Sequence, residues 1–296
     1  GEQEAKEIIA RKDETPIPIL ERLAKDSDEK VREAVVRNPN CPSNDLMELA
    51  QNSTDNIQYS IASRNYPTPR GVLLKLLESE NKSIFSGLAG NTYTPPDILA
   101  SLAENEQRDI RIKALSNANI PREVLSEALL NADNEKDVID ILREQSKNRQ
   151  NSPISSDLLE ELSIHPQDSI RYWVSTFTTA SAKTLERLSF EKNGQILENL
   201  AQNPNTPASI LIELAKRDRD ITDKTYYYHI HSRIISRNDV PAEALEHIAC
   251  KSASLAELTL RYANTPTSVL ELLVENISET YVLCDVAKHS DVTLDI

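Results

Sequence analysis

The chain has 296 residues, a formal net charge of −14 and an apolar content of 39%. A negative charge of this size disfavours non-specific binding to nucleic acid or to an anionic membrane surface. With only 5 glycines and 4% aromatic residues, the composition is typical of a helical chain rather than a β-rich one. We therefore expect an all-α protein.

The three cysteines, Cys41, Cys250 and Cys284, lie far apart and form no CxxC motif. This spacing predicts reduced, partly buried thiols rather than a zinc or redox site. The sequence shows no apolar run of membrane-spanning length and no signal peptide at its start. We therefore expect a cytoplasmic protein without a membrane segment.

A repeat with a period near 26 residues runs along the chain. We take as its anchor the residue four positions before the first leucine, or its equivalent, of a leucine-bearing segment. The anchors are Pro16, Pro42, Pro69, Pro95, Pro121, Ser155, Ser181, Pro207, Pro241 and Pro266, and an eleventh would be Val292. Seven of the nine steps between the first ten are 25–27 residues and two are 34, which indicates a repeat array. The sequence predicts one helical-repeat domain over residues 1–296.

Each repeat is expected to contain two short helices, which we call the A helix and the B helix. The A helix follows the anchor, as in LMELAQ (46–51), with apolar residues on one narrow face. The B helix precedes the next anchor, as in VREAVVRN (31–38). An anchor proline suits the first turn of a helix, and the asparagine that ends the B helix suits a left-handed helix stop.

Two kinds of irregularity interrupt the array. The repeats around 155–190 are degenerate, because serine replaces the anchor proline at Ser155 and Ser181. The two long steps carry insertions of about eight residues, within 130–153 and within 216–238. Each insertion is either a loop on one edge of the array or a longer B helix.

Three blocks of this chain, VREAVVRN, NPNCP…LMELA and NPNTP…LIELA, resemble the repeats of the variant leucine-rich repeat family. The family pattern is VR-x₂-VA-x-NP-x-TP followed by L-x₂-LA-x-D, and the resemblance covers Pro16 to the C-terminus. It implies a right-handed α-solenoid, a superhelix of about ten two-helix repeats distantly similar to HEAT and armadillo arrays, with a scaffold or binding role. The period here is slightly long for that family. The clustered cysteines of its iron–sulfur member are absent from this sequence, so no iron–sulfur function is implied.

Catalytic motifs are absent from the sequence, which has no GxxxxGK[ST], GxGxxG, GxSxG or HExxH. His229 and His231 follow three tyrosines in the second insertion. Positions i and i+2 point apart on a helix, so this pair makes a poor metal chelate. We therefore expect no enzyme activity, no metal, no cofactor and no small-molecule substrate.

Arginine and aromatic residues gather in the B helices, whereas glutamate dominates the A helices. The predicted spans carry roughly +4 in the B series and roughly −9 in the A series. Solenoids bind along a concave surface that one helix series lines, and arginine and aromatic residues are enriched at binding hot spots. The expected binding residues on this face are Arg32, Tyr59, Arg64, Phe85, Arg111, Arg171, Tyr172, Arg233, Arg261 and Tyr262.

The function that these patterns favour is a non-catalytic protein–protein interaction scaffold. Its partner would be an extended, acidic protein or peptide bound by the B helices. The alternative is a HEAT-like solenoid that binds nucleic acid on the same basic and aromatic face. A third interpretation is that the aromatic residues fill the core and the arginines pair with neighbouring acids.

Overall fold

The computed structural model describes residues 1–79, 81–132, 134–147, 152–217, 225–262 and 265–289. This part of the chain forms 21 α-helices and contains no strand. The chain divides into two compact units, Gly1–Ile154 and Ser155–Ile296. The all-α repeat fold is confirmed, whereas a single domain over 1–296 stays a prediction. The eleventh anchor, Val292, lies outside the described residues.

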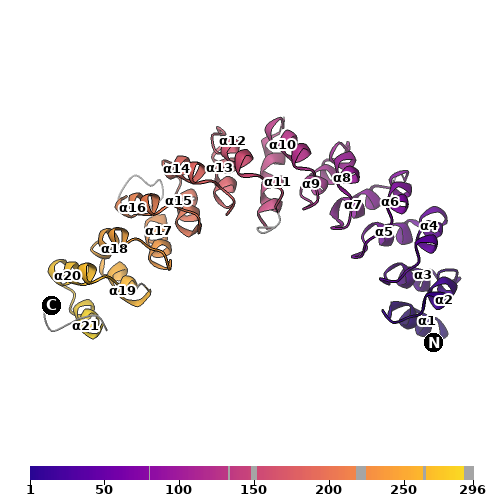
Figure 1. The fold of residues 1–296 in the computed structure, drawn as a ribbon, viewed down its shortest axis with the longest axis horizontal. Helices are drawn as coiled ribbons and strands as arrows, with labels where there is room; N and C mark the ends of the chain where they lie inside the picture. The colour runs from indigo at the N-terminus through magenta and orange to yellow at the C-terminus, as the bar shows by residue number, and fades with distance from the viewer. Residues whose placement is uncertain (80, 133, 148–151, 218–224, 263–264, 290–296) are drawn as a thin grey trace. The chain divides into compact units, whose positions relative to one another are not determined.

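The A and B helices alternate along each unit (Figure 1). The A helices of unit 1 are α2 (Ile17–Leu23), α4 (Ser43–Asn52), α6 (Arg70–Leu77), α8 (Pro96–Ala103) and α10 (Arg122–Leu130). Its B helices are α3 (Glu29–Val36), α5 (Asp55–Ala62), α7 (Lys82–Gly90), α9 (Arg108–Leu115) and α11 (Glu135–Lys147), preceded by α1 (Glu2–Arg11), which packs on α3.

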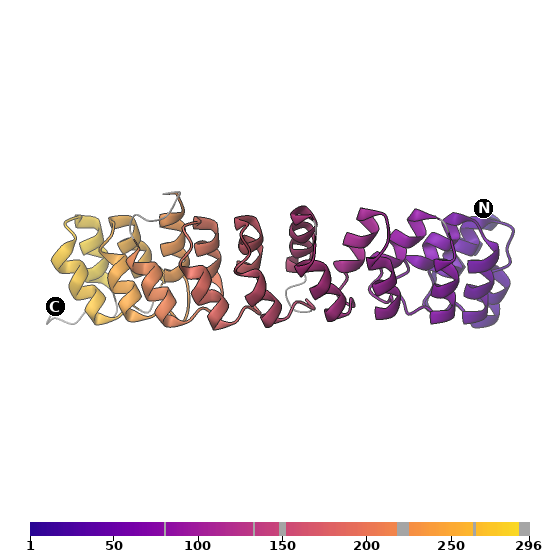
Figure 2. The same cartoon turned by 90° about the horizontal axis from the view of Figure 1, so that it is seen from above.

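The second unit has the same organisation. Its A helices are α12 (Ser156–Leu162), α14 (Ala182–Ser189), α16 (Ala208–Lys216), α18 (Ala242–Ala249) and α20 (Thr267–Asn276). Its B helices are α13 (Asp168–Ser175), α15 (Gly194–Gln202), α17 (Thr225–Ile235), α19 (Ala253–Tyr262) and α21 (Thr280–Lys288). Within each unit, successive helices of one series stand side by side (Figure 2).

The B helices of unit 1 pack more closely than its A helices. Apart from α4 and α6, neighbouring A helices contact one another less extensively than neighbouring B helices do, because small residues such as Ala34, Ser60 and Gly87 lie buried between the B helices. A Cβ added at Gly87 would lie 3.0 Å from the Cβ of Ala62. The more closely spaced row forms the inner side of a bend, and Figure 1 shows the B helices of unit 1 on that side.

Each of the ten anchors is the N-cap residue of an A helix. Proline was expected one position later, in the first turn. Its restricted φ, for example −61° at Pro42, suits the extended N-cap as well. In the degenerate repeats the hydroxyls of Ser155 and Ser181 accept hydrogen bonds from the amides of Leu158 (3.2 Å) and Thr184 (3.1 Å). Serine therefore supplies a side-chain cap where proline is missing.

The asparagine at the end of a B helix joins its repeat to the preceding one. Asn117 Nδ2 donates to the carbonyls of Ala89 (3.0 Å) and Asn91 (2.9 Å), and its Oδ1 accepts from the amide of Asn119 (3.0 Å). The same repeat position holds the donors Asn38, Arg64, Asn91, Gln145, Asn203 and Arg237. We call this series of side-chain-to-backbone bonds the inter-repeat ladder. After α13 this repeat position holds Phe177, whose side chain cannot donate a hydrogen bond. Its backbone carbonyl still accepts a hydrogen bond from Asn203 Nδ2 (3.1 Å).

The left-handed helix stop expected at these asparagines is wrong. No described residue has a positive φ, and the C-caps Asn91 and Asn203 have φ values of −79° and −66°. The neighbouring threonine ends the B helix in another way, since Thr94 and Thr206 each donate to the carbonyl six residues earlier at 2.6 Å. The asparagine and threonine of the NP-x-TP pattern are therefore explained by hydrogen bonding rather than by backbone handedness.

Both insertions lengthen a B helix. The first extends the end of α11, which has 13 residues where most B helices have 8 to 10. The second extends the start of α17, which has 11 residues. Residues 148–151 and 218–224 of these two insertions lie outside the described part of the chain.

Candidate functional site

Three of the expected binding arginines fold back onto their own loops. Arg32, Arg111 and Arg171 each follow the first buried aliphatic residue of a B helix. In all three, Nη1 donates to the carbonyls five and six residues earlier, at 2.6 to 3.0 Å. These bonds hold the loop between the A and B helices, so much of each guanidinium is occupied within the repeat.

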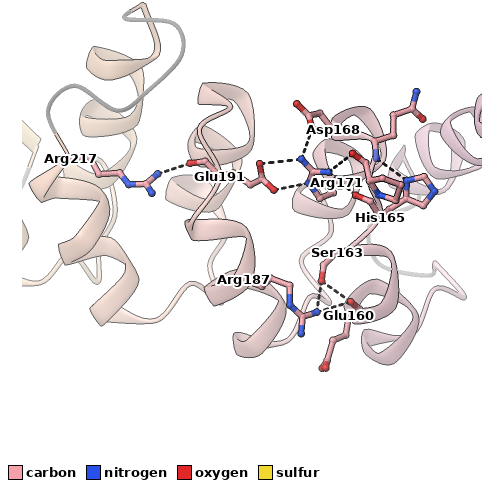
Figure 3. Close-up of polar contacts among 10 residues, drawn as sticks. Glu160, Ser163, His165, Asp168, Arg171, Arg187, Glu191 and Arg217 are labelled. Atoms are coloured by element: carbon pink, nitrogen blue, oxygen red, sulfur yellow. Dashed lines mark hydrogen bonds and ion pairs between the residues drawn. The ribbon is translucent and has the colours of Figure 1, made fainter.

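Arg171 is the most extensively bonded of the three (Figure 3). Its Nε donates to Glu191 Oε1 at 2.6 Å, its Nη2 contacts Glu191 Oε2 at 3.3 Å, and it also pairs with Asp168. The hydrogen bond that Arg171 donates to the carboxylate of Glu191 is the main reason why the pKa of Arg171 is raised. Arg111 makes a longer ion pair, 3.7 Å from Nη2 to Asp137 Oδ2.

Arg64 belongs to the inter-repeat ladder rather than to the exposed surface. Its side chain is only 4% exposed, and its Nη2 donates to the carbonyl of Asn38 at 2.8 Å. The guanidinium also lies over the ring of Tyr66, 5.8 Å from the ring centre. Burial lowers the pKa of Arg64. It therefore has little surface to offer a partner.

The remaining arginines of the expected site are exposed and paired on the surface. Arg233 Nε lies 3.2 Å from Glu198 Oε1, and Arg261 Nη2 lies 2.6 Å from Glu257 Oε1. Surface pairs of this kind stabilise a fold only slightly, so both arginines can exchange their partner for a ligand. The side chain of Tyr262 lies outside what the structure describes.

The aromatic residues of the expected site differ in exposure. Tyr59 is 44% exposed on α5, and its ring lies beside Gly87 of α7. Phe85 and Tyr172 are half-buried, and Tyr172 packs edge-on against Trp173 with ring centres 5.1 Å apart. Tyr59 is therefore the member of the expected set that presents a large aromatic face.

A groove of about 690 Å³ crosses three successive B helices, α5, α7 and α9, near their N-terminal ends. Its lining consists of Asp55, Asn56, Tyr59, Asn81, Lys82, Ser83, Ser86, Gln107, Asp109 and Ile110. Of these, only Tyr59 was expected from the sequence. The others stand one to three positions before the first buried aliphatic residue of the helix, at that residue, or two positions after it. Applying that register to each repeat would have found them.

The charge of the two rows differs from the expectation. Over the observed bounds, the ten B helices contain thirteen basic and twelve acidic residues, whereas the A helices contain seven basic and fifteen acidic residues. The positive charge of the B series is smaller than expected because Arg37, Arg64 and Arg237 lie beyond the ends of their helices. Only the A helices, which together we call the A row, carry a large net charge.

The two histidines of the second insertion, His229 and His231, lie in different environments on α17. His229 is exposed, whereas His231 is buried with its Nε2 3.3 Å from the carbonyl of Ala215. Gln58 makes the corresponding bond in its own repeat, from Nε2 to the carbonyl of Ala50 at 2.8 Å. The described residues contain no group of three or more His, Cys, Asp or Glu side chains placed to hold a metal ion. This geometry gives His231 a structural role.

Tyr227 and Lys251 complete the cluster around His231. The rings of Tyr227 and His231 meet edge-on at 4.3 Å, and Lys251 Nζ lies 5.6 Å from the centre of the tyrosine ring. Burial lowers the pKa of His231 and Lys251 and raises that of Tyr227. Each group is therefore shifted towards its neutral form, as in a packed cluster.

None of the helices in the described ranges combines the length and apolar character needed to cross a bilayer. No protein-family model matches the chain, and no curated protein matches it. The variant leucine-rich repeat assignment therefore stays a prediction.

Several solved structures are similar over nearly their whole length. An engineered protein is 13% identical, with 97% of this chain and 93% of that one covered and a TM-score of 0.38. A HEAT-like repeat protein from Thermococcus onnurineus is 13% identical, with 98% and 90% covered and a TM-score of 0.21. A designed armadillo repeat protein in complex with the peptide (KR)4 is 14% identical, with 92% and 96% covered and a TM-score of 0.20. These TM-scores are low, so the helical-repeat fold of this chain is established by its own helices.

Proposed function

We propose that this protein is a non-catalytic scaffold that binds an extended polypeptide segment along its B helices. The observation that carries the proposal is the groove across α5, α7 and α9. It spans three repeats, and an extended surface formed by successive repeats is the usual binding surface of a solenoid. The finer assignment to the variant leucine-rich repeat family agrees with this role.

The groove suits a polypeptide better than a small ligand. Neighbouring packed helices lie about 8–10 Å apart, so three helices extend over about 20 Å. An extended chain rises about 3.3 Å per residue, so about six residues fit along this length. Uncharged groups such as Asn56, Ser83 and Gln107 can bond to a peptide backbone, while Tyr59 supplies apolar contact.

Charge in the groove is mixed. Lys82 can pair with an acidic side chain of the partner, and Lys113 lies nearby with its Nζ 2.9 Å from Ser86 Oγ. Asp55 and Asp109 repel such a side chain at the ends of the groove. An acidic residue is therefore favoured at the centre of the bound segment, over α7, rather than along its whole length.

Arg111 and Arg171 are poor positions for a test, because replacing either by glutamate would also break its bonds to the loop. We would instead replace Tyr59 by alanine, with Tyr93→Ala as the matched control. Tyr93 is 46% exposed, close to the 44% of Tyr59, and it does not line the groove. A second variant, Ser83→Trp, would fill the groove.

The assay is capture of partners from a lysate of cells that naturally express the protein, with and without nuclease. The proposal predicts a nuclease-resistant protein partner that Tyr59→Ala and Ser83→Trp lose and Tyr93→Ala retains. If all three variants retain the partner, the groove is not its binding site. Nuclease-sensitive capture would favour the nucleic-acid alternative, with binding that falls steeply as salt is raised.

A further inference from the structure

Two large apolar side chains project from the same place in successive repeats of unit 2. Ile164, just after α12, is 67% exposed, and Phe190, the C-cap of α14, is 75% exposed. These are the highest exposures of any large apolar residue in the described ranges. They lie 26 residues apart, one repeat period. In the other repeats this position holds Lys25, Gln51, Glu78, Glu104, Leu130, Lys216, Cys250 and Glu275.

A hollow lies beside each of the two side chains. The first, of about 300 Å³, is lined by Ile164 together with residues of α12 and Arg187 of α14. The second, of about 280 Å³, is lined by Phe190 and by residues of α14 and α16, including Ile210 and Leu214. The A row of unit 2 therefore presents two consecutive hollows, each with an apolar side chain in its wall. We call this surface the A-row patch.

Acidic side chains surround both hollows. Asp157, Glu160 and Glu161 line the first, and Glu186 and Glu213 line the second. Glu160 pairs with Lys183, and Glu213 lies 3.6 Å from Lys216. Both pairs are exposed at one partner or both, so a ligand can replace them at low cost.

The two arginines of the A-row patch bond to the protein itself (Figure 3). Arg187 Nη1 donates to the carbonyl of Glu160 (3.1 Å) and to Ser163 Oγ (2.9 Å). Arg217 Nη1 donates to the carbonyl of Glu191 at 2.7 Å. Because these bonds hold the guanidinium groups against the repeats, the carboxylates dominate the charge that a partner meets.

We propose that the A-row patch of unit 2 docks an amphipathic helical segment of a partner protein, with two apolar side chains flanked by lysine or arginine. Side chains two turns apart on a helix are separated by about 10.5 Å, which is slightly more than the distance of about 8–10 Å that is typical between neighbouring packed helices. One apolar side chain would meet Ile164 and the other Phe190. The flanking basic groups would meet Glu161 and Glu186.

A second copy of this chain is a poor occupant. It would bring the same acidic row, since the A helices carry fifteen acidic and seven basic residues, and like charges in contact oppose association. The A-row patch and the B-helix groove lie on different helices and in different units, so the two proposals fail or succeed independently.

The test is selection of random 16-residue peptides displayed on phage against the wild-type protein. Synthetic copies of the selected peptides are then measured by fluorescence anisotropy. The proposal predicts sequences with two apolar residues about seven positions apart and with lysine or arginine between or beside them. The double variant Ile164→Ser/Phe190→Ser should bind them roughly 30-fold more weakly or worse, as expected for loss of a hot spot.

Two controls make the outcome specific. Ile17→Ser removes another exposed apolar side chain, 53% exposed on the A helix α2 of unit 1, and should leave binding unchanged. Tyr59→Ala should also leave it unchanged. Selected peptides that are acidic, or that bind the double variant as well as wild type, would overturn the proposal. So would a wild-type dimer, seen by sedimentation, that the double variant abolishes.

Discussion

Replacing Asn117 by alanine should uncouple α9 from α7. The change removes two hydrogen bonds to the carbonyls of Ala89 and Asn91 and a third from the amide of Asn119. Each such bond contributes about 1 kcal/mol net, and the side chain is buried, so the lost stability is about 3 kcal/mol. This corresponds to a roughly 100-fold change in the local opening equilibrium.

The matched control is Asn119→Ala. Its Nδ2 donates a single bond, to the carbonyl of Thr92, in an exposed setting, so the loss should stay below about 1 kcal/mol. A third variant, Asn117→Asp, keeps the shape and the acceptor but places a carboxylate against two carbonyls. It should cost at least as much as Asn117→Ala at neutral pH.

The assay is native-state hydrogen exchange of the amides of α7 and α9, because repeat arrays open locally rather than in one step. The ladder interpretation predicts that these amides lose protection in Asn117→Ala and keep it in Asn119→Ala. Equal protection in the two variants would show that packing alone joins the repeats, and the ladder would then be a by-product of it.

Three further predictions follow from buried groups. Gly194→Ala should destabilise the protein by about 1–3 kcal/mol, because the added Cβ would lie 2.5 Å from the Cβ of Tyr226 on α17. In the control Gly90→Ala, the added Cβ meets only the movable end of the Lys113 side chain, so stability should be unchanged or slightly higher. Thermal denaturation of both variants measures the difference. Burial lowers the pKa of His231 below its ordinary 6.5, so stability should fall as the pH drops below 6.5; His231→Gln should flatten this dependence in urea titrations, and parallel curves would contradict it. Burial raises the pKa of Cys41 to about 12, so iodoacetamide at pH 8 should alkylate the exposed Cys284 and spare Cys41 until denaturant is added, as read by mass spectrometry.

The helices could be predicted from the sequence because the residues that mark their starts are local signals. Proline or serine stands at the start of every A helix, and a first aliphatic residue such as Val31 or Ile57 is buried near the start of every B helix except α17. Both signals depend only on neighbouring residues and on a period. A chain with ten such signals at near-constant spacing has few alternatives to a stack of helix pairs.

The roles of polar side chains could not be predicted in the same way. Arg171 looks like an exposed cation in the sequence, but the loop before α13 turns two carbonyls towards it. Asn117 looks like a local helix stop, but its partners lie 26 and 28 residues away. The contacts of Asn117 depend on the stacking of repeats, and those of Arg171 depend on the path of the loop before α13, so the pattern of a single helix encodes neither. The groove was missed for the same reason, since three helices contribute to it.

The chemistry of the inter-repeat ladder also bears on how such a chain evolves. Each donor of the ladder forms its hydrogen bond with a main-chain carbonyl, a group that every amino acid carries. Asn203 bonds to Phe177 as it would to an asparagine, and Arg64, Gln145 or Arg237 serves as donor in place of asparagine. A repeat can therefore be duplicated, deleted or exchanged without a matching mutation in its neighbour at this joint. Array length and surface sequence are then free to diverge, while the joint between repeats stays the same.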